Sequence, residues 1–139
     1  GVNVYSGITF GKRFEDWKAL SPKPMYLGEF GADAYNATIK SVDELSQAKA
    51  TAALLKEVQA NLSAKDPSRV AVGAAIYEWN DEWWKDEAGK PDTQETGGIA
   101  PGGGPYPDAT FNEEWWGLVD IDRKTRPAYD EVKAVWGVD

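Results

Sequence analysis

Short apolar segments alternate with amphipathic ones along the chain, and this order constrains the fold more than any other feature of the sequence. The apolar segments are bounded by glycine, proline or charged residues, which is typical of strands buried on both faces of a parallel sheet. The predicted strands lie near residues 1–6, 24–30 and 70–79. The predicted helices lie near residues 12–20, 42–64 and 126–137. Repeated strand–helix units predict an α/β fold with parallel strands in sequential order.

The longest predicted helix carries its own start signal. Ser41 stands three residues before Glu44, which is the spacing of a capping box with serine at the cap position. Apolar residues then recur every three or four positions and predict one buried stripe. This stripe consists of Leu45, Ala48, Ala52, Leu55, Val58 and Leu62.

Three strand–helix units are too few to close an eight-stranded barrel, which typically needs about 250 residues. The 139 residues suffice for one domain, residues 1–139, with a core of its own. The pattern therefore leaves two architectures open, a small open α/β sheet or the last three-eighths of a barrel. Because Gly1 already stands in strand-like sequence, we expect a fragment boundary there.

Composition excludes several function classes. The chain has 15 basic and 23 acidic residues, so its net charge of −8 argues against binding to nucleic acid or to anionic membranes. No apolar run approaches the length of a membrane span. Cysteine and histidine are absent, so the usual zinc ligands are missing and catalysis would depend on carboxylates, tyrosines or hydroxyls. The acidic loop after the third strand lacks an EF-hand pattern, and we predict neither a metal nor a cofactor.

A single carboxylate ends the second predicted strand. Glu29 follows the apolar run of residues 25–27 and stands between Gly28 and Gly31. Burying an ionised carboxylate is costly without partners, and the glycines let the backbone bend sharply or approach another group closely. Two interpretations follow. Either Glu29 points into a cleft at the carboxyl end of the sheet, or it caps a turn or pairs with an arginine.

An acidic, aromatic and glycine-rich loop spans residues 80–114 and includes the Pro101–Pro105 run. Loops of this length are usually functional or mobile. Seven tryptophans are many for this chain length, and their faces can stack on sugars or fill a core. Residues 116–122 are predicted to form a short extended segment.

Four segments, in order, resemble the retaining glycoside hydrolases of the large (β/α)8-barrel clan, which includes β-galactosidase/glucuronidase-like and cellulase-like families. Residues 24–31 resemble the seventh strand, which ends in the nucleophilic glutamate. Residues 2–5 resemble the sixth strand, which often places a tyrosine beside the nucleophile. Residues 76–85 resemble the eighth strand and its loop, where a tryptophan floors a sugar subsite, and residues 117–129 resemble the closing segment.

The resemblance implies a partial TIM barrel made of the last three βα units, with a long Trp/Gly-rich loop after the last strand. It implies that Glu29 is the nucleophile of a retaining mechanism and that Tyr5 orients it. Binding of substrate is expected from Trp79, Asn80, Glu78, Trp83, Trp84 and Tyr35. The residues by themselves equally allow structural roles: core packing for Tyr5 and Trp79, and a solvated face for residues 80–82.

The clan carries its acid/base glutamate on the fourth strand, to which no segment of this chain corresponds. We therefore expect a fragment of a hydrolase or transglycosylase that acts on β-glucan or another β-glycoside, is inactive alone and needs an N-terminal barrel half. The alternatives are a non-catalytic carbohydrate-binding domain and a barrel piece that forms homo-oligomers through its open sheet edges. The sugar stays open, as does the compartment, although a secreted or periplasmic parent fits.

Overall fold

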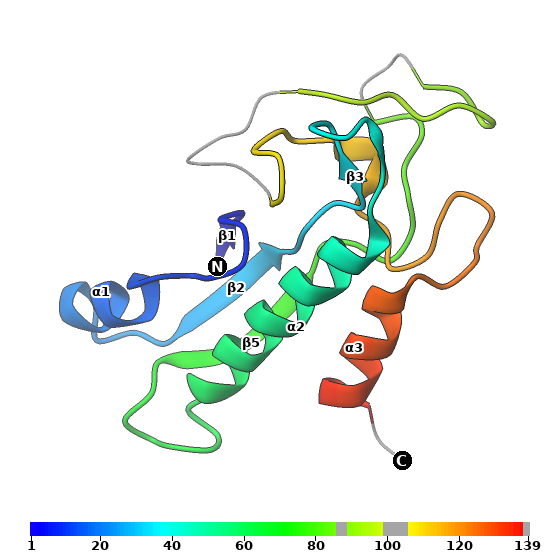
Figure 1. Cartoon of the computed structure of the whole chain (residues 1–139). Coiled ribbons are helices and arrows are strands. Elements are labelled where there is room, and N and C mark those ends of the chain that lie inside the picture. The colour runs from blue at the N-terminus through cyan, green and yellow to red at the C-terminus, as the bar shows by residue number, and fades with distance from the viewer. Residues whose placement is uncertain (86–88, 99–105, 138–139) are drawn as a thin grey trace.

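A computed structural model describes residues 1–85, 89–98 and 106–137 of the chain (Figure 1). The Pro101–Pro105 run lies outside the described residues. The main sheet consists of three parallel strands, β1 (Val2–Val4), β2 (Met25–Phe30) and β5 (Ala71–Ile76). They pair in the order β1-β2-β5, so the predicted parallel α/β sheet with sequential strands is confirmed.

Three α-helices alternate with these strands, each within a turn or so of its predicted bounds. They are α1 (Arg13–Leu20), α2 (Glu44–Ala60) and α3 (Pro127–Trp136). In Figure 1, α2 runs along β2 and β5, and α3 lies beside α2. One core cluster joins Leu27 of β2, Phe14 of α1 and Leu55 of α2, and Val132 of α3 packs against it. The three helices thus share one face of the sheet. Within the described ranges, no helix is long and apolar enough to cross a membrane.

The opposite face of the sheet is open. Tyr26 of β2 is 44% exposed and Val72 of β5 is 56% exposed, whereas their neighbours Met25, Leu27 and Ala71 are buried. The expectation that these strands are buried on both faces is therefore wrong for the described chain. The physical reason is that all three helices pack on the same side.

The start of α2 differs from the predicted capping box. Asp43 is the N-cap, and its side chain accepts a hydrogen bond from the Ser46 backbone N–H at 3.1 Å. Ser41 instead belongs to β4 (Ser41–Val42), which pairs antiparallel with β3 (Tyr35–Asn36) in a small hairpin that the sequence pattern did not indicate. This pairing holds Ser41 outside the helix.

The predicted stripe of α2 is largely buried. Leu45 is the exception at 65% exposure, because it lies in the first turn, before the buried residues begin at Gln47. Ala48, Leu55 and Val58 all lie in the core.

The long loop is anchored where it rejoins the sheet. Leu118 N–H donates to the Glu78 carbonyl at 2.9 Å, and Val119 N–H donates to the Trp79 carbonyl at 3.0 Å. The segment after the loop therefore runs beside the residues that follow β5, in keeping with the predicted extended piece. Asp81, fully buried, accepts from both Nη1 and Nη2 of Arg126 at 2.6 and 2.7 Å. The start of the loop is therefore tied to the start of α3.

Candidate active site

Glu29 and Tyr5 meet at the carboxyl ends of adjacent strands. The parallel register pairs Asn3 of β1 with Glu29 of β2, so Tyr5 extends just beyond its strand toward the carboxylate. Tyr5 Oη donates a hydrogen bond to Glu29 Oε2 at 2.5 Å. Burial raises the pKa of Tyr5 well above its usual value, and the hydrogen bond and negative charge of Glu29 raise it further. The phenol therefore stays protonated and can donate at any physiological pH.

Three aromatic side chains hold the Tyr5 ring in place. Its centroid lies 5.0 Å from Trp116, 5.1 Å from Phe111 and 6.0 Å from Tyr77, each in an edge-to-face arrangement. Trp116 is almost completely buried, at 1% exposure. Because edge-to-face packing is geometrically specific, this cluster restricts the direction of the Tyr5 hydroxyl.

Tyr77 reaches this cluster because the backbones of β2 and β5 come very close. Tyr77 N–H donates to the Phe30 carbonyl at 2.7 Å. A Cβ at position 31 would collide with the Tyr77 carbonyl oxygen, so only Gly31 permits the approach. Of the two roles that the glycines around Glu29 allow, a sharp bend or a close approach to another group, Gly31 has the second.

A polar group adjoins the aromatic cluster. Tyr77 Oη contacts Glu82 Oε2 at 3.3 Å, and Lys85 Nζ lies 3.3 Å from Glu82 and 3.7 Å from Glu113. Burial, followed by the charge of Glu82, raises the pKa of Glu78 to about 8. Burial also raises the pKa of Tyr77 to about 12. In the part of the chain that is described, this side of the site is predominantly acidic.

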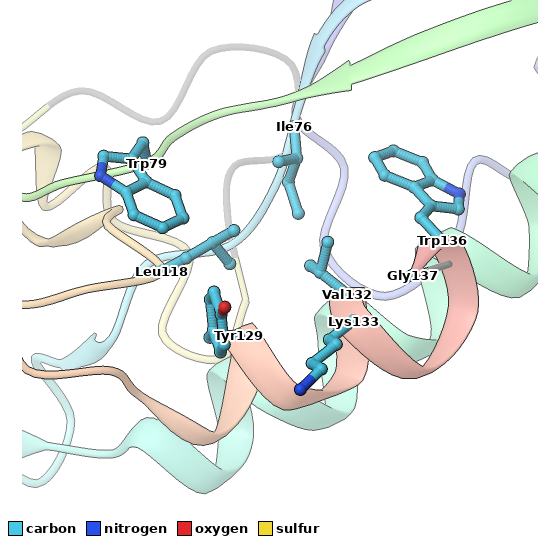
Figure 2. Close-up of a pocket in the computed structure, with 8 residues that line it drawn as sticks. All are labelled: Ile76, Trp79, Leu118, Tyr129, Val132, Lys133, Trp136 and Gly137. Atoms are coloured by element: carbon cyan, nitrogen blue, oxygen red, sulfur yellow. The ribbon is translucent and has the colours of Figure 1, made fainter. Parts of the chain in front are cut away.

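Trp79 lies elsewhere than expected. Its ring packs edge-to-face on Tyr129 of α3 at 5.9 Å and is 59% exposed. Figure 2 shows it with Ile76, Leu118 and Val132 around a groove between β5 and α3. Of the aromatic residues that directly follow β5, it is Tyr77, two residues before Trp79, whose ring lies beside Tyr5. The backbone leaves the regular strand after Ile76, so alternation no longer indicates which side chains face the site.

The other expected substrate-binding residues have contacts of their own. Asn80 donates to the Asp81 carbonyl at 2.5 Å, and Tyr35 packs on Trp115 with ring centroids 5.2 Å apart. Trp83 and Trp84 pack edge-to-face on each other at 5.5 Å, and Trp84 is 48% exposed. Of the expected substrate-binding residues, Glu78, two residues beyond β5, adjoins the polar group beside Tyr77.

Sequence reasoning missed four residues of the site, which come from three parts of the chain: Tyr77, Lys85, Phe111 and Glu113. Trp116 is one of the tryptophans expected to stack on sugars or fill a core, and it is buried against Tyr5. Tyr77 carried the clearest signal, because it directly follows the third strand just as Glu29 ends the second. The other three lie in the long loop, and nothing in their local pattern predicts that they lie beside Tyr5 or Tyr77. Within the described ranges, no group of three or more carboxylates is placed to hold a metal ion.

Comparisons with known proteins find similarity in structure only. No protein-family model matches the sequence, and no curated protein sequence matches it. A GH2 β-galacturonidase from Eisenbergiella tayi, solved with bound galacturonate, is similar over 96% of this chain with 18% identity and a TM-score of 0.52. A Bifidobacterium dentium β-glucuronidase complexed with coumarin-3-O-glucuronide is similar over 88% with 18% identity and a TM-score of 0.50.

The likeness shows a shared fold. The chain spans 22% of the β-galacturonidase and 16% of the β-glucuronidase. Its α/β unit thus corresponds to a minor part of much larger carbohydrate-active chains.

Proposed function

We propose that this chain is part of a glycoside hydrolase that acts on β-linked carbohydrate by a retaining double displacement, with Glu29 as the nucleophile. The observation that carries the proposal is the hydrogen bond from Tyr5 to Glu29 at the carboxyl ends of adjacent parallel strands. Enzymes built on parallel α/β barrels place their chemistry at this end of the sheet. The shared fold with glycosidases that bind galacturonate and a glucuronide supports a carbohydrate ligand.

The geometry suggests how the two residues act. Tyr5 holds Glu29 Oε2, which leaves Oε1 to attack the anomeric carbon and form a glycosyl ester that water then hydrolyses or another sugar accepts. Retaining enzymes need a second carboxyl group about 5–5.5 Å from the nucleophile to protonate the leaving group. We assign this acid to βα units outside the chain, so the isolated chain is inactive.

Both edges of the sheet support such a larger barrel. A groove of about 330 Å³ lined by Val2, Val4 and Trp17 lies beside β1, and one of about 360 Å³ lined by Ile76 and Val132 lies beside β5. In the proposal, the remaining units of an eight-stranded barrel cover both grooves and the open face of the sheet. Self-association of the chain through these edges is the second candidate. It predicts a concentration-dependent dimer in light scattering, which would disappear when the N-terminal units are supplied.

The decisive test is reconstitution of activity on an aryl β-glycoside. The chain alone should be inactive, and adding the N-terminal barrel units in trans should restore turnover. Glu29→Gln keeps the shape but removes the nucleophile and should lower kcat by roughly 10⁴-fold or more. Tyr5→Phe keeps the aromatic packing and should cost about 10- to 100-fold, the value of one hydrogen bond to a charged group. Full activity of the Glu29→Gln complex would disprove the assignment.

A further inference from the structure

Four oxygen atoms converge on one nitrogen beside the loop that packs on Tyr5. Asn112 Nδ2 lies 2.9 Å from Thr110 Oγ1, 3.0 Å from Asp33 Oδ2, 3.1 Å from the Tyr35 carbonyl oxygen and 3.4 Å from Asp108 Oδ2. A side-chain amide has two hydrogens and makes two good hydrogen bonds as a donor. The four oxygens thus share two side-chain hydrogens, and Asp33 Oδ2 and Asp108 Oδ2 also accept from the backbone N–H groups of Asn112 and Ala37.

The carboxylates in this group also lack a cationic partner. Asp33 is completely buried, and its Oδ1 has no hydrogen-bond partner. In residues 1–85, 89–98 and 106–137, no ion pair includes Asp33 or Asp108. Buried carboxylates are usually paired or bound to a metal.

Asp81 shows how this chain neutralises its other completely buried aspartate. It accepts two hydrogen bonds from Arg126, one from Gln94 and one from the Gly117 backbone N–H. Asp33 accepts from the side chain and backbone N–H of Asn112 and from the backbone N–H of Tyr35. Asp81 thus has a cationic partner, whereas Asp33 has only neutral donors beside it.

We propose that Asp33, Tyr35, Asp108 and Thr110 form a binding site for Ca²⁺. They supply two carboxylates, one of them with a free second oxygen, a backbone carbonyl and a hydroxyl, and water would complete the six to eight oxygen ligands that Ca²⁺ takes. Mg²⁺ fits less well, because it demands near-ideal octahedral geometry at shorter distances. The sequence pattern predicted no metal here, because two of these ligands come from residues 33–35 and two from residues 108–110.

The Asn112 side chain occupies the point where the oxygens converge. Its Oδ1 accepts from the Gly97 backbone N–H at 2.8 Å, which holds the amide in this orientation. Binding of Ca²⁺ requires this amide to rotate away, so the hydrogen bonds from Asn112 Nδ2 to these oxygens are exchanged for direct coordination of the ion. Because Phe111 packs on Tyr5, the bound ion would also fix the loop that supports the Tyr5–Glu29 pair.

The test uses the 139-residue chain and is independent of glycosidase activity. Titration calorimetry with CaCl₂ should show one site per chain, and Tb³⁺ should give luminescence sensitised by Tyr35 and Trp115. Ca²⁺ at about 100 times its Kd should raise Tm by roughly 8–12 °C, with a much smaller effect of Mg²⁺ at the same concentration. No Ca²⁺ binding up to millimolar concentrations, or equal effects of Mg²⁺ and Ca²⁺, would overturn the proposal.

Three variants locate the site. Asp108→Asn should weaken Ca²⁺ binding by about 100-fold, and Thr110→Val, which keeps the charge, by about 10-fold. Asp122→Asn is the matched control, because it removes one carboxylate from an exposed turn elsewhere and should leave the affinity unchanged. If Asp108→Asn and Thr110→Val bind Ca²⁺ with the affinity of the unmodified chain, as the control does, the ion binds elsewhere and the proposal is wrong.

Discussion

At the scale of single residues, the neighbouring side chains decide how each carboxylate is stabilised. Asp81 is buried and ionically paired with Arg126, whereas Glu29 accepts a hydrogen bond from a neutral phenol. Glu78 is partly buried beside Glu82, and its pKa rises to about 8. Glu78 therefore stays largely protonated at neutral pH.

Glu78→Gln should alter how stability depends on pH. In the unfolded chain Glu78 has its ordinary pKa of 4.5, and in the folded chain the pKa is about 8 because of burial and the charge of Glu82. Between these values the folded state retains a proton that the unfolded state has lost, so the contribution to stability is complete below pH 4.5 and is lost as pH rises to about 8. The Tm of Glu78→Gln relative to wild type should thus increase by several degrees from pH 5 to pH 8. Glu15→Gln, on the exposed side of α1, should show no such trend. Parallel Tm curves for Glu78→Gln and wild type would contradict this pKa.

At the scale of elements, periodicity predicted where the helices lie but not how α2 begins. Both Ser41 and Asp43 are residue types that favour an N-cap. The hairpin of β3 and β4 takes up Ser41, and Asp43 N–H donates to the Ala34 carbonyl at 2.7 Å. A tertiary contact therefore selects between two locally acceptable caps.

Asp43→Ala should lower the free energy of unfolding by about 1–2 kcal/mol, because it removes the acceptor for the Ser46 backbone N–H and for the Ser46 hydroxyl at 2.7 Å. Ser41→Ala should change it by less than about 0.5 kcal/mol, because Ser41 is exposed. Urea denaturation of the two variants shows which of the two residues caps α2. A larger loss of unfolding free energy from Ser41→Ala than from Asp43→Ala would show that Ser41 is the cap, as the capping box predicts.

At the scale of the whole molecule, the buried pair of Arg126 and Asp81 joins segments that are distant in sequence. Asp81 begins the long loop, and Gly117, which donates to Asp81 and accepts from Arg126, follows it. Arg126 is 2% exposed and immediately precedes α3. The pair thus fixes both ends of the loop that carries much of the candidate site.

Arg126→Met should destabilise the fold by about 3–5 kcal/mol, because it leaves the carboxylate of Asp81 buried without its counter-ion. Replacing both residues, Asp81→Leu with Arg126→Met, should recover much of this loss in urea denaturation. Lys124→Met, which breaks an exposed pair with Asp122, should have little effect. A negligible effect of Arg126→Met would mean that the pair does not hold the loop.

The local sequence pattern was sufficient to predict the parallel sheet and the three helices, and to single out Glu29 as a candidate site residue. Strand and helix periods are encoded over a few residues, and a carboxylate between glycines at a strand end is visible without knowledge of its neighbours. The pairing of Tyr5 with Glu29 was predicted through the resemblance to a known clan, and the structure brings the two side chains together.

The tertiary structure alone decided which aromatic side chains surround Tyr5 and which oxygens converge on Asn112. Tyr77 rather than Trp79 joins the site because the chain leaves the regular strand after Ile76, where alternation ceases to apply. Asp33 lies beside Asn112 because the long loop folds back over the end of β2, across 79 positions of sequence. Contacts between residues so far apart in sequence depend on the path of a loop, and local periodicity does not predict that path.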